Sequence, residues 1–226
     1  MAMRIDYPDR DALAKGLAAS VADTLRARLE AAGAASLAVP GGSTPAAFLS
    51  ALGEEDLDWR SVTVLATDER WAPPDHPRSN ERMIRETLMS GGAAPKLHSY
   101  WRGGTPGEAV GELAEAFAPA LPLDVCVLGM GADMHCASLF PGADALPSAL
   151  EPDAPPVMAI TAPGAPEPRV TLTARFLAGA GRLDLLITGD EKARVLDAAL
   201  ASADGLTAPI SAVLSAHPEP KAHWAP

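Results

Sequence analysis

Short apolar segments alternate with helical segments along most of this chain, and this alternation limits the possible folds more than any other feature. Segments typical of buried strands cover residues 36–39, 62–66, 125–128, 157–161, 169–172 and 183–188. Helices are expected over residues 9–32, 45–52, 78–89, 106–117 and 191–200. Since strands that alternate with helices form βαβ units, we expect an α/β fold with a mostly parallel sheet and helices on both faces.

The expected helix over residues 9–32 has the clearest periodicity, because Leu13, Leu17, Val21, Leu25 and Leu29 recur at every fourth position. Residues 210–214 are apolar and are expected to form a last strand. A proline-rich stretch over residues 147–168 is interpreted as a surface loop rather than a domain boundary. Because 226 residues suffice to bury most apolar surface in one unit, residues 1–226 are expected to form a single domain.

Charge and hydrophobicity exclude several classes of protein. The chain has 18 Lys and Arg against 29 Asp and Glu, a net charge of −11 that disfavours nucleic acid and anionic membranes as partners. A hydrophobic fraction of 48% argues against disorder. The first residues lack the apolar core of a secretory signal, and no apolar run approaches the roughly 20 residues that span a bilayer. We therefore expect a cytoplasmic protein, either a monomer or a weak homo-oligomer.

The first candidate binding motif follows the strand at residues 36–39 and consists of Gly41, Gly42, Ser43, Thr44 and Pro45. Thr44 suits a helix N-cap and Pro45 the first helical position. Two glycines give a ligand access to the backbone amides, and the start of a helix attracts anions. The same residues would also fit an ordinary turn between a strand and a helix.

A second motif follows the next strand, where Asp68 and Arg70 stand close to the carboxyl edge of the expected sheet, with Ser79 and Asn80 a few residues later. Arg70 could contact an anionic substrate or a developing oxyanion. Asp68 could bind sugar hydroxyls or orient another group. A solvated loop whose acid and base pair with each other is the alternative.

The third motif, residues 129–141, begins with two glycines and carries Asp133 and His135 just beyond the strand at 125–128. A histidine at the carboxyl edge of a parallel sheet is a candidate for proton transfer near neutral pH, although a hydrogen-bonded structural histidine fits the same pattern. Met134 stands where a dinucleotide fingerprint would need a third glycine. No metal is expected, since no second histidine or cysteine pair has ligand spacing. Cys136 is not interpreted as a nucleophile.

A fourth motif places Lys192 in the first turn of the helix expected after residues 183–188. A cation there opposes the helix dipole, which makes sense if it binds an anion. Arg169, at the start of another strand, is a further candidate cation. The remaining histidines have no supporting context and are expected on the surface: His76, His98, His217 and His223.

The order of these motifs along the chain resembles the 6-phosphogluconolactonase family. The similar stretches are residues 41–45, 68–70, 79–80, 129–141, 169–172 and 189–193. The sequence Ala-Ser-Leu-Phe-Pro at 137–141 distinguishes this family from the related glucosamine-6-phosphate deaminases. The resemblance implies a Rossmann-like three-layer sandwich of the sugar-phosphate isomerase and deaminase type. It also implies hydrolysis of 6-phospho-D-glucono-1,5-lactone to 6-phosphogluconate in the pentose phosphate pathway, with no metal or organic cofactor.

The resemblance also assigns roles to the candidate residues. His135 would be the general base, with Asp68 and Arg70 in the catalytic group. The sugar-phosphate lactone would be held by Gly41, Gly42, Ser43, Thr44, Asn80, Asp133, Arg169 and Lys192.

The chain departs from the family pattern beside the histidine, where Met134 and Cys136 replace the usual glycine and threonine. The substitutions are expected to add a bulky side chain at the pocket and to remove a hydroxyl. Two alternatives to the lactonase are a sugar-phosphate isomerase or deaminase of the same fold, and a non-catalytic sugar-phosphate-binding domain.

Overall fold

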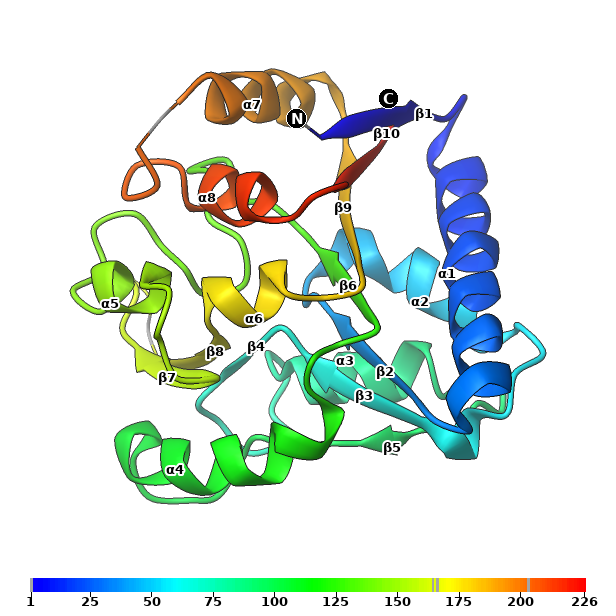
Figure 1. Cartoon of the computed structure of the whole chain (residues 1–226), viewed down its shortest axis with the longest axis horizontal. Helices are drawn as coiled ribbons and strands as arrows, with labels where there is room; N and C mark the ends of the chain where they lie inside the picture. The colour runs from blue at the N-terminus through cyan, green and yellow to red at the C-terminus, as the bar shows by residue number, and fades with distance from the viewer. Residues whose placement is uncertain (1, 164, 166, 203) are drawn as a thin grey trace.

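The computed structural model describes residues 2–163, 165, 167–202 and 204–226, and these residues form two β-sheets (Figure 1). The larger sheet is wholly parallel, and its strands in spatial order are β1 (Met3–Asp6), β10 (Lys221–Ala225), β9 (Arg182–Thr188), β6 (Val125–Leu128), β2 (Ala35–Val39), β3 (Val62–Ala66) and β5 (Lys96–Leu97). The smaller sheet is antiparallel and contains β4 (Asp68–Arg70), β8 (Arg169–Leu172) and β7 (Val157–Ile160). The predicted α/β architecture is confirmed, with the second sheet as an addition.

The direction of the chain across the large sheet decides which face each helix covers. From β1 through β2 and β3 to β5 the chain moves toward one edge, and through β6, β9 and β10 it returns. Right-handed crossovers then place the first three helices on one face and the later ones on the other (Figure 1). The helices are α1 (Arg10–Ala32), α2 (Ser43–Gly53), α3 (Asn80–Thr87), α4 (Pro106–Phe117), α5 (Leu146–Leu150), α6 (Ala174–Ala178), α7 (Asp190–Ala201) and α8 (Pro209–Ala216).

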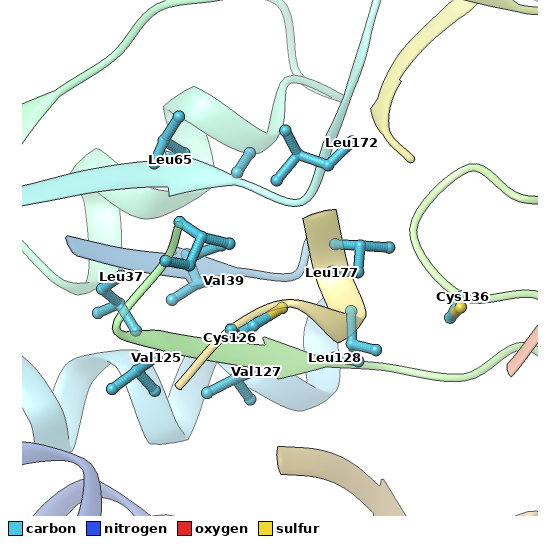
Figure 2. Close-up of a cluster of buried hydrophobic side chains, with 14 of the residues drawn as sticks. Leu37, Val39, Leu65, Val125, Cys126, Val127, Leu128, Cys136, Leu172 and Leu177 are labelled. Atoms are coloured by element: carbon cyan, nitrogen blue, oxygen red, sulfur yellow. The ribbon is translucent and has the colours of Figure 1, made fainter. Parts of the chain in front are cut away.

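The core lies on both faces of the central strands. Every residue of β2 and of β6 is buried, as expected for strands with helices above and below. Figure 2 shows Leu172 of β8 and Leu177 of α6 gathered with the side chains of β2 and β6. The apolar side chains of the second sheet therefore pack in the same core as those of the first. This packing fixes the positions of β4 and β8 relative to the large sheet.

Helix α1 packs on the face of the large sheet opposite to α6, through the predicted stripe of leucine and valine. Leu17, Val21 and Leu25 are fully buried, and burial of each such side chain stabilises the fold by about 1.5–3 kcal/mol. Asp9 caps the start by accepting a hydrogen bond from the Ala12 amide at 2.8 Å, and Gly33 ends the helix in a left-handed conformation. The prediction of this helix is confirmed to within one residue.

The topology also identifies where a ligand should bind. Strands β2 and β6 are neighbours, yet the chain leaves β2 toward one face of the sheet and leaves β6 toward the other. Such a switch point opens a crevice beyond the carboxyl ends of the two strands, and open α/β proteins bind their ligands there. The segments that enter this crevice are 40–45 and 129–135, which carry the first and third motifs.

Three expectations about the fold are wrong. Residues 210–214 lie in helix α8 instead of a strand, because Pro209 occupies a first-turn position that suits proline. The stretch 147–168 is not a loop throughout, because it includes most of α5, which was not predicted, as well as β7, which matches the strand expected over residues 157–161. Its residues 164 and 166 lie outside the described residues. His217 and His223 are buried rather than exposed.

Among the described residues, no helix is long and apolar enough to cross a membrane. The single-domain organisation stays a prediction.

Candidate active site

The four sequence motifs meet around one cavity of about 340 Å³ at the carboxyl edge of the large sheet. The predicted site residues that line it are Gly41, Gly42, Ser43, Thr44, Asp68, Arg70, Asn80, His135, Arg169 and Lys192. Asp133 does not line the cavity but contacts His135 beside it. The structure thus brings together residues that are as far apart in the sequence as Gly41 and Lys192.

The start of α2 forms one wall of this cavity. The helix begins at Ser43 with Gly42 as its N-cap, so the expectation that Thr44 would be the cap is wrong. Gly42 has a φ of 108° and has no side chain to cap the helix, and the first turn contains no acidic residue. The amides of this first turn lack intrahelical partners, and together with the helix dipole they form a site that suits an anion.

A close contact between two motifs explains why residue 41 is glycine. A Cβ atom at Gly41 would lie 1.9 Å from Oδ1 of Asn80, so any side chain there would displace Asn80. The Nδ2 atom of Asn80 donates a hydrogen bond to the Asp68 carbonyl at 2.7 Å. Asn80 therefore joins the loop before α2 to the segment after β3.

Glu69 is a residue of the second motif whose importance the sequence did not reveal. Its carboxylate is buried and accepts hydrogen bonds from the amides of Arg70, Asn80 and Glu81 and from the Ser79 hydroxyl, at 2.7–3.0 Å. Burial raises the pKa of Glu69, and these four hydrogen bonds oppose that rise. Glu69 thus secures the start of α3 and with it Asn80. Its only signal in the sequence was its place between Asp68 and Arg70.

Asp68 faces the cavity and is held from the opposite side by the histidine loop. The Ser138 hydroxyl, fully buried, donates to Oδ2 of Asp68 at 2.5 Å. A guanidinium nitrogen of Arg169 lies 3.9 Å from the same oxygen. Asp68 is therefore a carboxylate held in place by the Ser138 hydroxyl and the Arg169 cation. It does not pair with Arg70, as it would in the solvated loop that the sequence offered as the alternative.

Two arginines stand opposite each other on neighbouring strands of the small sheet. Arg70 of β4 is the register partner of Arg169 of β8. Like charges in this position destabilise a sheet, and burial together with the Arg70 charge lowers the pKa of Arg169. The Nε atoms of both arginines are buried without a hydrogen-bond partner among the described residues. An anionic or strongly polar ligand group in the cavity would offset the repulsion between the two arginine charges and offer an acceptor for their Nε atoms.

The imidazole of His135 is fixed on one side and open on the other. Its Nδ1 atom lies 2.5 Å from Oδ1 of Asp133, and its ring packs against Phe140 with centroids 4.3 Å apart. A Cβ atom at Gly131 would lie 2.1 Å from Nδ1, so glycine is required for this ring position. Nε2 makes no hydrogen bond to the described residues and is free to exchange a proton with a molecule in the cavity.

Although burial alone would raise the pKa of Asp133, its contacts with His135 hold that pKa below the ordinary value. Asp133 is therefore ionised at neutral pH. An ionised partner at Nδ1 favours the tautomer with its proton on Nδ1, which leaves Nε2 as the acceptor.

Lys192 lies in the first turn of α7, as predicted, and lines the cavity near the β6 loop. Its Nζ atom donates a hydrogen bond to the Met130 carbonyl at 2.9 Å. This contact holds the ammonium group at the cavity wall while leaving two of its protons for a ligand. A third cation, besides Arg70 and Arg169, is thus available at the cavity.

Comparison with known proteins identifies the family to which the chain belongs. The model of the family described as Glucosamine-6-phosphate isomerases/6-phosphogluconolactonase matches residues 8–224. A 6-phosphogluconolactonase from Rhizobium meliloti is 44% identical over 225 residues, which is 97% of each chain. Another from Pseudomonas aeruginosa is 42% identical over 217 residues, 94% of this chain and 90% of that one. The chain belongs to the 6-phosphogluconolactonase family.

Solved structures extend the likeness to three dimensions. A 6-phosphogluconolactonase from Shewanella baltica superposes with a TM-score of 0.95 at 33% identity, covering 100% of this chain and 98% of that one. A monomeric glucosamine-6-phosphate deaminase has a TM-score of 0.83 at 16% identity, covering 99% of this chain and 97% of that one. The second comparison shows a shared fold alone.

The two departures from the 6-phosphogluconolactonase pattern do not act as expected. The side chain of Met134 packs against the hydrophobic core and is absent from the cavity lining, so it is not a bulky group at the pocket. Cys136 is fully buried, and burial raises the pKa of its thiol. Neither residue offers a side chain to a ligand, which separates both from the binding chemistry of the cavity.

The backbone at Met134 nevertheless shows why glycine suits this position. Met134 has a φ of 66°, in the left-handed region that side chains disfavour. Met134→Gly is expected to have a free energy of unfolding about 1 kcal/mol higher than that of Met134→Ala, measured by urea denaturation, because both variants lose the side-chain packing and only glycine relieves the positive φ. The matched control is Ala132→Gly in the same loop, where φ is not positive and the added freedom of the unfolded chain should destabilise. Equal changes in both variants would contradict the argument.

Proposed function

We propose that this chain hydrolyses 6-phospho-D-glucono-1,5-lactone to 6-phosphogluconate, as a step of the oxidative pentose phosphate pathway. The observation that carries the proposal is the arrangement of His135, which lines the cavity with its Nδ1 atom on Asp133 and with no hydrogen bond from Nε2 to the described residues. The activity named for the family members above supports the choice of substrate.

In the proposed reaction, Nε2 of His135 takes a proton from a water molecule as the water oxygen attacks the lactone carbonyl. A tetrahedral intermediate forms, and its negative oxygen is stabilised by the cation pair of Arg70 and Arg169. The bond between the carbonyl carbon and the ring oxygen then breaks. The proton on His135 passes to this departing oxygen, which becomes a hydroxyl. General base and acid catalysis of this kind typically contributes about 10²–10⁴-fold in rate.

The remaining cavity residues fit the two ends of the substrate. We assign the phosphate to the first turn of α2 and to Lys192, where amides, hydroxyls and an ammonium group are available. Asp68 and Asn80 would accept and donate hydrogen bonds to the sugar hydroxyls. These local contacts would overcome the net charge of −11, which by itself repels an anionic substrate.

A coupled assay tests the function directly. Purified protein is added to freshly formed lactone, and 6-phosphogluconate is measured through its dehydrogenase, with the spontaneous hydrolysis subtracted. Acceleration above that background is expected. If the rate equals the background, the lactonase proposal fails, and calorimetry with 6-phosphogluconate then tests the non-catalytic binding domain. Release of ammonia from glucosamine 6-phosphate would instead indicate the deaminase.

Removal of the Lys192 ammonium group should mainly weaken substrate binding. Lys192→Ala is expected to raise KM about 10- to 100-fold, since a hydrogen bond to a charged group contributes about 1.5–3 kcal/mol, with a much smaller effect on kcat. Lys15→Ala, on the exposed surface of α1, is the control and should leave both constants unchanged. An unaltered KM in Lys192→Ala would exclude the assigned phosphate role.

A further inference from the structure

The turn that leads from β9 into α7 is held from outside the cavity by the last strand of the sheet. Gly189 donates its amide to the Ala225 carbonyl at 2.8 Å. The Gly189 carbonyl accepts a hydrogen bond from the indole Nε1 of Trp224 at 3.1 Å. The backbone N–H and C=O groups of Gly189 are therefore both hydrogen-bonded to β10, although Gly189 lies just beyond the paired residues of β9 and β10.

This turn determines where α7 begins. Gly189 is the N-cap of the helix and has φ 84° and ψ 153°, a backbone conformation that is essentially restricted to glycine. Its carbonyl also accepts the first hydrogen bond of the helix, from Ala193 at 3.2 Å. Thr188 and Lys192, on either side of the turn, both line the cavity. A shift of the Gly189 carbonyl would consequently move the first turn of α7 and the Lys192 ammonium group.

Trp224 is well placed to prevent such a shift. The Arg4 guanidinium lies over its ring, 4.3 Å from the centroid, and β10 is paired on both sides, with β1 and with β9. We propose that Trp224 is a positioning residue for substrate binding, acting on Lys192 through its hydrogen bond to Gly189. This inference rests on the proposed role of Lys192 at the phosphate.

The test is Trp224→Phe, which removes the N–H donor and keeps an aromatic ring under Arg4. Loss of one hydrogen bond of this kind is expected to raise KM for the lactone between about twofold and tenfold, with kcat unchanged. The matched control is Trp59→Phe, which removes an indole hydrogen bond to the Glu55 carbonyl. Trp59 lies just before the first residue of β3, at the end of the strand away from the cavity, so this variant should leave KM unchanged. Trp224→Tyr serves the same purpose should phenylalanine prevent folding.

A double-mutant cycle separates this inference from the proposed function. If Trp224 acts through Lys192, Trp224→Phe raises KM in the natural background and has no further effect in Lys192→Ala. An equal increase in both backgrounds overturns the inference, because Trp224 would then act by another route. An unchanged KM in Trp224→Phe, with a raised KM in Lys192→Ala, overturns it and leaves the phosphate site standing. If Lys192→Ala itself leaves KM unchanged, the phosphate assignment fails, and the inference with it.

Discussion

Replacing His135 with alanine is expected to lower kcat for the lactone about 10²–10⁴-fold, with little change in KM. The reason is that Nε2 is the group we assign to take a proton from water and return it to the ring oxygen, while the substrate is held by other residues. The imidazole contacts Asp133 and Phe140 but sits at the cavity wall, so its removal should leave the fold intact. Steady-state kinetics with freshly formed lactone measures the effect.

His98→Gln is the control for this variant, because His98 packs against Phe117 away from the cavity. It should retain the natural kcat. Circular dichroism of both variants checks that the structure is preserved. A His135→Ala enzyme that keeps the natural turnover would remove His135 as the general base, and the proposed hydrolysis would need another proton acceptor.

Replacing Asp184 with alanine is expected to destabilise the protein by about 3–5 kcal/mol. Asp184 is fully buried and accepts hydrogen bonds from Nε of Arg182 at 2.6 Å and from Nε2 of His223 at 3.0 Å. Tyr7 in turn contacts Nδ1 of His223 at 3.0 Å. Without the carboxylate, the Arg182 guanidinium, which is only 12% exposed, has lost its counter-ion. Urea denaturation followed by tryptophan fluorescence measures the difference.

The pH dependence of this difference provides an independent check. Burial by itself would raise the pKa of Asp184, but the hydrogen bonds from His223 and Arg182 and the Arg182 charge outweigh it and lower the pKa. A carboxyl with a lowered pKa in the folded state stabilises the protein above its unfolded pKa of about 3.9 and loses that effect as the pH falls through the folded value. The difference in free energy of unfolding between the natural protein and Asp184→Ala should therefore decrease below about pH 4.

Asp11→Ala is the matched control for Asp184→Ala, because Asp11 pairs with Lys15 on the exposed surface of α1. It should change stability by less than about 1 kcal/mol. A similarly small change in Asp184→Ala, or a gap that stays constant down to pH 3, would contradict the account of the buried network.

The sequence predicted those parts of the fold that have a regular local pattern. Residues 62–66, 106–117 and 125–128 lie in their predicted elements without a shift, because apolar runs and helical periodicity record burial directly. It did not predict β10, whose residues 221–225 mix charge, histidine and tryptophan. His223 is buried in that strand because Asp184 and Tyr7 are its partners, and these lie far away in the sequence.

The candidate site could be predicted as a set of residues but not as an arrangement. Glycines, cations and a histidine after strands indicated a ligand site, and the cavity brings all but Asp133 to its wall. The sequence could not show that Arg70 and Arg169 stand opposite each other, because this depends on the antiparallel sheet that β4 forms with β8. Nor could it show that Glu69 faces inward, since only the fold supplies its four donors.

The position of β10 in the sheet has a consequence for how the molecule is made. Strand β1 pairs with β10 along the register that joins Met3 to Lys221, and among the described residues it has no other partner in the sheet. During synthesis β1 therefore cannot pair within the sheet until residues 221–225 have left the ribosome. Closing contacts between such distant segments is slow, and an unpaired edge of β9 is exposed to misassembly meanwhile.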